Sequence, residues 1–166
     1  MGKHDDAERL QFATRADWRT WLADHHDTST GLFVIYYKKS AKQPGPTYDD
    51  LIEEALCVGW VDGTLRTVDD ARTSLWFCPR RTGSGWAATN KARVDRLRAD
   101  GLMRPAGEAA IARAQADGSW ALLERSDALE VPPELESALA AVRGARAAFD
   151  ASSPSLRKQY IYQVDT

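Results

Sequence analysis

The sequence predicts an α+β protein, in which a small three-stranded sheet packs with N-terminal helices and a helical C-terminal half follows. Three short runs rich in β-branched and aromatic residues lie within residues 32–79, and segments with helical periodicity precede and separate them. The strand signals stop by residue 84, and helical periodicity continues from there. We expect one domain over residues 1–166, with an α/β portion over approximately 12–104 and a helical portion over 105–166.

The first predicted helix covers residues 14–26, because Thr14 and Asp17 have capping-box spacing and apolar residues then recur three and four positions apart. Residues 32–38 form an apolar run that is too short for a confident helix. Its β-branched and aromatic side chains are typical of a buried strand. We therefore expect a central strand there.

A second helix is predicted after Thr47 and Asp50, which repeat the capping-box spacing, and it should end near Gly59. Residues 60–70 alternate apolar and polar side chains, and residues 72–79 form another apolar run. Together they predict two partner strands joined by a turn. These two strands complete the expected sheet.

The rest of the chain is predicted to be helical. A helix should open at the Gly-Ser-Gly loop near Ser84 and end at Gly101. Further helices are expected at 104–118, at 131–150 as one or two pieces, and after the Ser153–Pro154 pair.

Composition places the chain among globular proteins. Hydrophobic residues make up 43% and charged residues 28%, which excludes disordered, collagen-like and disulfide-scaffold classes. The net charge of −2 gives no overall attraction to nucleic acid or acidic membranes. The charged N-terminus and the absence of an apolar run of about 18 residues predict a cytoplasmic protein without a membrane span. Cys57 and Cys78 lie in apolar stretches and are expected to be buried free thiols.

Positive charge gathers in the middle of the chain. Residues 60–104 hold nine basic and five acidic side chains. Within this region, Arg80 and Arg81 precede the Gly-Ser-Gly loop around Ser84. A helix N-terminus with exposed N–H groups and nearby guanidinium groups suits a phosphate or carboxylate. The alternative is structural: Ser84 caps the helix and the arginines pair with nearby aspartates.

The joint between the second helix and the next strand is another candidate site. Trp60 offers a planar surface and Asp62 lies in a turn, where it could act as a general base or orient an arginine. A turn aspartate that binds its own backbone is the structural alternative. Most aromatic residues are expected in the core, with Trp60 and Trp86 as possible stacking surfaces beside the basic region.

Familiar catalytic and metal-binding motifs are absent from the sequence. The three histidines are His4 and the adjacent pair His25 and His26, and none has metal-ligand spacing. There is no GxSxG motif, and neither cysteine has a histidine at a recognisable offset. We therefore predict no metal and no cofactor.

Four segments taken together resemble a known family. They are YDDLIEEALCVGWVDGTLR at 48–66, PRRTGSGWAATNKARVDRL at 79–97, GLMRPAG at 101–107 and ADGSW at 116–120. In this order they resemble the bacterial YdeI/OmpD-associated family, also labelled bacteriocin-protection proteins. The resemblance implies an association with tolerance to bacteriocins or antimicrobial peptides and with an outer-membrane porin, and it implies no established reaction.

The preferred hypothesis is a non-catalytic stress or antimicrobial-tolerance protein that binds a small anionic ligand or a protein partner. The expected binding residues are Trp60, Asp62, Arg66, Arg80, Arg81, Ser84, Trp86 and Asn90. One alternative is an enzyme that acts on a small phosphorylated or carboxylated substrate with Asp62 as acid/base. Another is a nucleic-acid-binding protein that uses the basic helix at 88–100. Any porin association is expected to be indirect at most, since the sequence contains no recognisable export signal.

Overall fold

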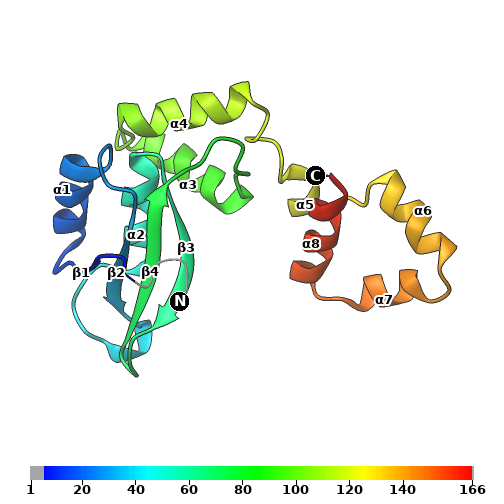
Figure 1. The fold of residues 1–166 in the computed structure, drawn as a ribbon, viewed down its shortest axis with the longest axis horizontal. Coiled ribbons are helices and arrows are strands. Elements are labelled where there is room, and N and C mark those ends of the chain that lie inside the picture. The colour runs from blue at the N-terminus through cyan, green and yellow to red at the C-terminus, as the bar shows by residue number, and fades with distance from the viewer. Residues whose placement is uncertain (1–5, 166) are drawn as a thin grey trace. The chain divides into compact units, whose positions relative to one another are not determined.

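A computed structural model describes residues 6–165, which contain eight α-helices and one four-stranded sheet. The α+β class is confirmed. The described chain divides into two compact units (Figure 1). The first unit ends at Arg81 and resumes over Ala92–Arg113, whereas the second comprises Thr82–Lys91 and the chain from Ala114 onward. That residues 1–166 form a single domain stays a prediction.

The sheet has the order β1-β2-β4-β3. Strand β2 (Leu32–Tyr37) pairs antiparallel with β4 (Arg72–Pro79), and β4 pairs antiparallel with β3 (Trp60–Thr67). These are the three predicted strands, and β2 is central as expected. The prediction of only three strands is wrong, because β1 (Arg9–Gln11) adds a parallel edge strand along β2. Arg9 and Gln11 are exposed and Leu10 is half-buried, so this segment has no apolar run. Only its pairing with the edge of β2 defines the strand.

The first two helices form as predicted. In α1 (Arg15–His25) the Thr14 hydroxyl accepts from the Asp17 N–H, and the Asp17 carboxylate accepts from the Thr14 N–H. The same reciprocal capping precedes α2 (Tyr48–Cys57). A short 3-10 turn, η1 (Lys39–Ala41), lies between β2 and α2 and was not predicted.

The core of the first unit forms between these helices and one face of the sheet. The rings of Trp18 on α1 and Phe77 on β4 have centroids 5.4 Å apart. The Trp18 indole N–H donates to the carbonyl oxygen of Leu51 on α2 at 3.1 Å. All three residues are completely buried. Trp18 therefore contacts both the sheet and α2 while its only polar side-chain atom stays hydrogen-bonded.

The second unit is helical, as predicted for the C-terminal half. It contains α5 (Glu124–Asp127), α6 (Pro133–Ala141), α7 (Ala145–Ala151) and α8 (Pro154–Asp165) (Figure 1). Phe149 and Ile161 are buried in it. The predicted cap of the last helix is present, since the Ser153 hydroxyl accepts from the Leu156 N–H at 3.3 Å.

Two helices, α3 (Ala88–Ala99) and α4 (Pro105–Ala116), contribute residues to both units. The predicted start of α3 near Ser84 is wrong by about one turn, because the helix begins at Ala88. Trp86 is buried with its ring centroid 5.0 Å from that of Trp120. A Cβ on Gly85 would lie 2.7 Å from Leu123. Packing within the second unit therefore fixes this segment in a non-helical conformation.

Candidate functional site

The eight residues predicted to bind a ligand are divided between the two units. The first unit holds Trp60, Asp62, Arg66, Arg80 and Arg81, and the second holds Ser84, Trp86 and Asn90. Each group is therefore considered within its own unit.

Two of the predicted residues, Asp62 and Arg80, do come close in the first unit. Arg80 follows β4 and is half-buried. This burial lowers its pKa to about 10, although the negative charge of Asp62 partly opposes the change. The Tyr48 hydroxyl lies 3.5 Å from Asp62 Oδ2, the outer limit of a hydrogen bond. Asp62 thus lies near a phenol and a guanidinium group. It belongs to β3, beside a register irregularity between Asp62 and Leu65, so its predicted position in a turn is wrong.

The two tryptophans that were considered as stacking surfaces are core residues. Trp60 is 1% exposed and its indole N–H donates to the His26 carbonyl oxygen at 3.0 Å. Trp86 is completely buried in the second unit. Neither indole presents a face to a base or a sugar. Arg66 is half-buried and covers a core ring, with its Cζ atom 4.8 Å from the centroid of the buried Phe33 ring.

The loop between β4 and α3 already binds carboxylates of the chain itself. The Gly83 N–H donates to Asp117 at 3.1 Å, and the Ala88 N–H at the start of α3 donates to Asp127 at 2.7 Å. Ser84 lies one turn before the helix and does not occupy its N-cap position. Two backbone donors of this loop are therefore satisfied within the second unit.

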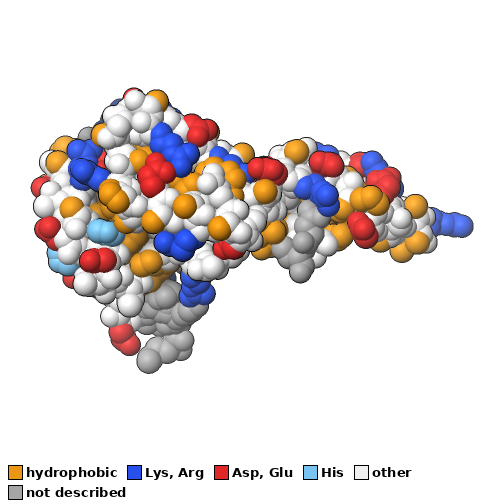
Figure 2. Space-filling view, turned by 90° about the horizontal axis from the view of Figure 1, so that it is seen from above, with side chains coloured by type: hydrophobic (Ala, Val, Ile, Leu, Met, Phe, Trp, Pro, Cys, Tyr) orange, Lys and Arg blue, Asp and Glu red, His pale blue; other side chains and the backbone are white. Residues whose placement is uncertain are grey.

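The basic residues of α3 are neutralised by ion pairs. Lys91 pairs with Glu124, Arg93 with Asp49, Arg96 with Glu53 and Arg98 with Glu108. Figure 2 likewise shows Lys and Arg side chains interspersed with Asp and Glu on the visible face. These ion pairs reduce the positive charge that α3 offers to a phosphate backbone.

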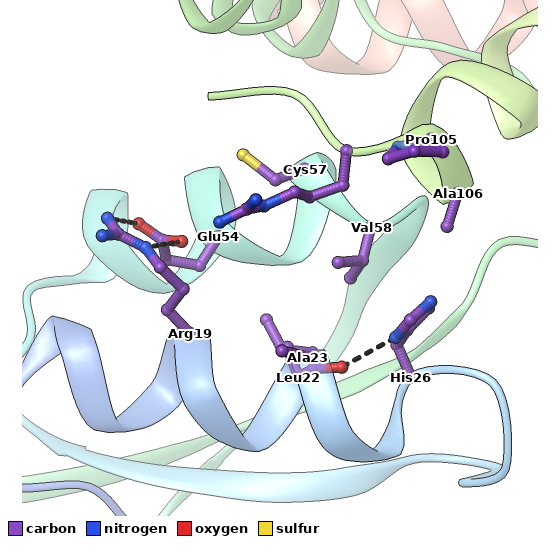
Figure 3. A pocket seen from close by; sticks show the side chains of 10 residues that line it. Arg19, Leu22, Ala23, His26, Glu54, Cys57, Val58, Pro105 and Ala106 are labelled. Carbon is purple, nitrogen blue, oxygen red and sulfur yellow. Dashed lines mark hydrogen bonds and ion pairs between the residues drawn. The ribbon is translucent and has the colours of Figure 1, made fainter. Parts of the chain in front are cut away.

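A pocket of about 510 Å³ opens among α1, the end of α2 and the first turn of α4. Figure 3 shows the Arg19–Glu54 pair at one end, His26 at the other, and apolar side chains between them. Its wall consists of Arg19, Leu22, Ala23, His26, Glu54, Cys57, Val58, Arg104, Pro105 and Ala106. All of these residues belong to the first unit. A mostly apolar pocket with a few polar groups is typical of a small-molecule site.

The Glu54 end of the pocket is held rigidly. Glu54 is 3% exposed and accepts hydrogen bonds from Arg15 at 2.5 Å and from Arg19 at 2.6 and 2.8 Å. Burial alone would raise the pKa of Glu54, but the hydrogen bonds and charges of Arg19 and Arg15 bring it below its usual value. Glu54 therefore stays ionised and its charge is compensated.

Close packing of α4 on the end of α2 forms another wall. The Arg104 N–H donates to the Cys57 carbonyl oxygen at 3.0 Å. A Cβ on Gly107 would lie 2.4 Å from that same oxygen, so only glycine permits this approach. The Cys57 thiol is buried, which raises its pKa to about 11. The prediction of free thiols is confirmed for both cysteines, although Cys78 is only half-buried.

Arg104 is the cation of this pocket that has no carboxylate partner among residues 6–165. Arg104 is exposed and lines the pocket. Its positive charge opposes the rise of the Cys57 pKa. Pro105 begins α4, whose positive N-terminal end favours an anion. At the other end, His26 Nδ1 lies 2.8 Å from the Leu22 carbonyl oxygen. That contact assigns the proton to Nδ1 and leaves Nε2 for a further hydrogen bond.

Sequence reasoning missed this pocket, because its residues come from three segments that folding brings together. The available signal was the segment RPAG, where an arginine precedes a helix-starting proline and a glycine follows on the same turn. In the described part of the chain, no three His, Cys, Asp or Glu side chains gather as metal ligands. No helix there is long and apolar enough to span a membrane.

Comparisons with known protein families match two separate segments of the chain to different families. Residues 10–110 match a domain of unknown function, DUF8412. Residues 128–166 match the family described as bacteriocin-protection, YdeI or OmpD-associated, which confirms the predicted family for this C-terminal segment. The four segments that suggested the family all lie before residue 128, and three of them fall within the DUF8412 match. No curated protein and no solved structure matches the chain. The chain therefore belongs to the DUF8412 family and carries a C-terminal segment similar to the YdeI/OmpD-associated family.

Proposed function

We propose that this protein binds a small amphiphilic anion, without transforming it, in the pocket between α1, α2 and α4. The ligand would have an apolar body and one carboxylate or a similar anionic group. The match to bacteriocin-protection proteins supports a cellular role in tolerance to bacteriocins or antimicrobial peptides. The observation that carries the proposal is that Arg104, beside an apolar pocket, has no carboxylate partner in the described part of the chain.

The pocket chemistry supports binding rather than catalysis. At neutral pH the Cys57 thiol is protonated, because burial has raised its pKa. Glu54 is held between two arginines and cannot readily take up a proton. Besides His26 and the two arginines, the remaining contacts come from aliphatic side chains, which favour an apolar ligand body.

The loop with Arg80 and Arg81, the anion site expected from the sequence, remains the second candidate location. Its Gly83 N–H and the Ala88 N–H at its end already bind Asp117 and Asp127, so a ligand anion would have to displace these carboxylates. The pocket near Arg104 requires no such displacement. We therefore favour the pocket.

Calorimetric titration with octanoate tests the proposal, since this probe combines an apolar tail with one carboxylate. We expect octanoate to bind at least fivefold more tightly than octanamide, which has the same tail and no charge. Arg104→Gln should weaken octanoate binding about fivefold to tenfold, as expected for a partly exposed charge-assisted hydrogen bond, and leave octanamide binding unchanged.

Arg81→Gln is the matched control, because Arg81 is also an exposed arginine of the first unit. Octanoate affinity should be the same in this variant as in the parent protein. If Arg81→Gln weakens binding and Arg104→Gln does not, the basic loop is the anion site. Absence of octanoate binding at millimolar concentrations would refute the amphiphilic-anion proposal.

A further inference from the structure

A second pocket, of about 410 Å³, lies in the first unit between the end of β2, η1 and the start of α2. Three of its residues, Lys38, Lys39 and Lys42, are basic within a stretch of five. Tyr36, Tyr37 and Tyr48 supply aromatic walls. We call this cavity the lysine–tyrosine pocket. It shares no residue with the Arg104 pocket.

The lysines present positive charge that no carboxylate of the described residues neutralises. The Lys38 ammonium group donates to the backbone carbonyl oxygens of Asp69 and Asp70, at 2.8 and 3.3 Å. Lys39 and Lys42 are exposed, and neither forms an ion pair within residues 6–165. Lys42 also has a left-handed backbone with φ of 51°, which is uncommon for a residue with a side chain. Two ammonium groups near one cavity suit a doubly charged anion better than a single carboxylate.

The acidic residue of the pocket does not cancel this charge. Asp49 lines the pocket, but its carboxylate accepts a hydrogen bond of 2.7 Å from Arg93. Asp69, at the turn that holds Lys38, likewise pairs with Arg72 at 2.7 Å. An incoming anion therefore meets lysines whose charge is available.

The tyrosines provide a flat, partly apolar wall. The Tyr36 and Tyr48 ring centroids are 6.4 Å apart, and Tyr48 is 41% exposed whereas Tyr36 is buried. Burial is the main cause that raises the pKa of both phenols, so both stay neutral near pH 7 and do not repel an anion. An exposed aromatic ring next to lysines favours a ligand that combines a planar ring with a phosphate group.

We propose that the lysine–tyrosine pocket is a binding site for an aromatic phosphate monoester of mononucleotide size. The phosphate would bind between Lys39 and Lys42, and the ring would pack against Tyr48. This site is independent of the proposed function, because it uses other residues and another ligand class.

Titration of isotope-labelled protein with AMP, followed by amide chemical shifts, tests this proposal. We expect the largest shifts at residues 36–49 and weaker binding of both adenosine and inorganic phosphate. The double variant Lys39→Gln/Lys42→Gln should bind AMP about tenfold more weakly, since each exposed ion pair contributes a severalfold effect. Tyr48→Leu should weaken the binding of AMP and leave the binding of inorganic phosphate unchanged.

Arg113→Gln is the matched control, because it removes one exposed cation with no ion pair among residues 6–165. AMP affinity should not change in that variant. The proposal is refuted if AMP does not bind at 10 mM, if the double lysine variant binds it normally, or if adenosine binds equally well. Octanoate binding to the same variants separates this result from the proposed function, since the lysine substitutions should leave it unaltered.

Discussion

The carboxylate of Asp127 accepts a hydrogen bond of 2.7 Å from the backbone N–H of Ala88, the first residue of α3. The same side chain pairs with Lys158 of α8 at 2.9 Å. Burial alone would raise the pKa of Asp127, but the Lys158 and Ala88 hydrogen bonds lower it below its usual value. The Asp127 carboxylate therefore occupies the start of α3 in the second unit, close to where the sequence suggested that a ligand anion would bind.

Two substitutions of Asp127 should lower the stability of the protein by different amounts. Asp127→Asn keeps an acceptor for the Ala88 N–H but loses the charge, and we expect a loss of about 1 kcal/mol. Asp127→Ala also removes the acceptor and should cost about 2 kcal/mol in total. Urea denaturation at pH 7 measures both. Glu130→Gln is the control, because Glu130 is exposed and has no ion pair among residues 6–165, and equal stability of all variants would contradict the prediction.

Gly107→Ala should destabilise the protein although alanine normally favours a helix. A Cβ at this position would lie 2.4 Å from the Cys57 carbonyl oxygen, which is backbone and cannot move independently. We expect a loss of about 2–3 kcal/mol, against a helix-propensity gain of about 1 kcal/mol without the clash. Octanoate binding should weaken too, because α4 forms one wall of the Arg104 pocket.

Gly101→Ala provides the comparison for this clash. Gly101 has φ of 66°, and a Cβ there would meet nothing within 4 Å. Its cost should be backbone strain alone, about 1 kcal/mol, with octanoate binding unchanged. A Gly107→Ala variant as stable as the parent protein would show that α4 moves freely away from α2.

Local signals in the sequence predicted most of the elements, because the interactions that define them are short-range. The capping boxes at Thr14 and Thr47 involve residues three positions apart, and both form as predicted. Strand β1 was missed because its pairing with β2 joins residues more than 20 positions apart. The start of α3 was misplaced for a similar reason, since Trp120 and Asp127 lie far from it in sequence.

The candidate site was harder to predict than the fold. Basic residues such as Arg93 and Arg96 stand out in the sequence, but folding pairs them with Asp49 and Glu53. Arg104 is another basic residue of the region 60–104. It lines an apolar pocket and has no carboxylate partner among the described residues. Charge counting cannot distinguish these cases, because the partner carboxylates lie more than 40 positions away.

Glu54→Gln should destabilise the protein at neutral pH and have little effect in acid. The native pKa of Glu54 is lowered, so its ionised form adds stability above the unfolded-state pKa of about 4.3. That stability is lost as the pH falls through the native pKa. We expect a difference of about 2 kcal/mol at pH 7 that shrinks toward pH 2.

Urea denaturation of both proteins over this pH range measures the effect. Glu136→Gln is the control, because the Glu136–Arg146 pair is exposed and should contribute little to stability at any pH. A Glu54→Gln difference that stays constant from pH 7 to pH 2 would mean that lost packing, and not lost charge, causes the destabilisation.

The two thiols should differ strongly in reactivity. Burial, together with the negative charge of Glu54, raises the pKa of Cys57 to about 11, so only about one molecule in a thousand carries the thiolate at pH 8. Cys78 is half-buried and should react first with a disulfide reagent such as Ellman's reagent. Cys78→Ser should remove the fast phase, and Cys57→Ser should remove the slow phase.

Reaction of Cys57 also reports on the pocket that it lines. Bound octanoate should slow the Cys57 phase further, because the ligand covers the thiol and stabilises the folded state in which the thiol is buried. The Cys78 phase serves as an internal control and should keep its rate. If octanoate slows both phases equally, it acts on the stability of the whole protein, and the pocket beside Arg104 is not its binding site.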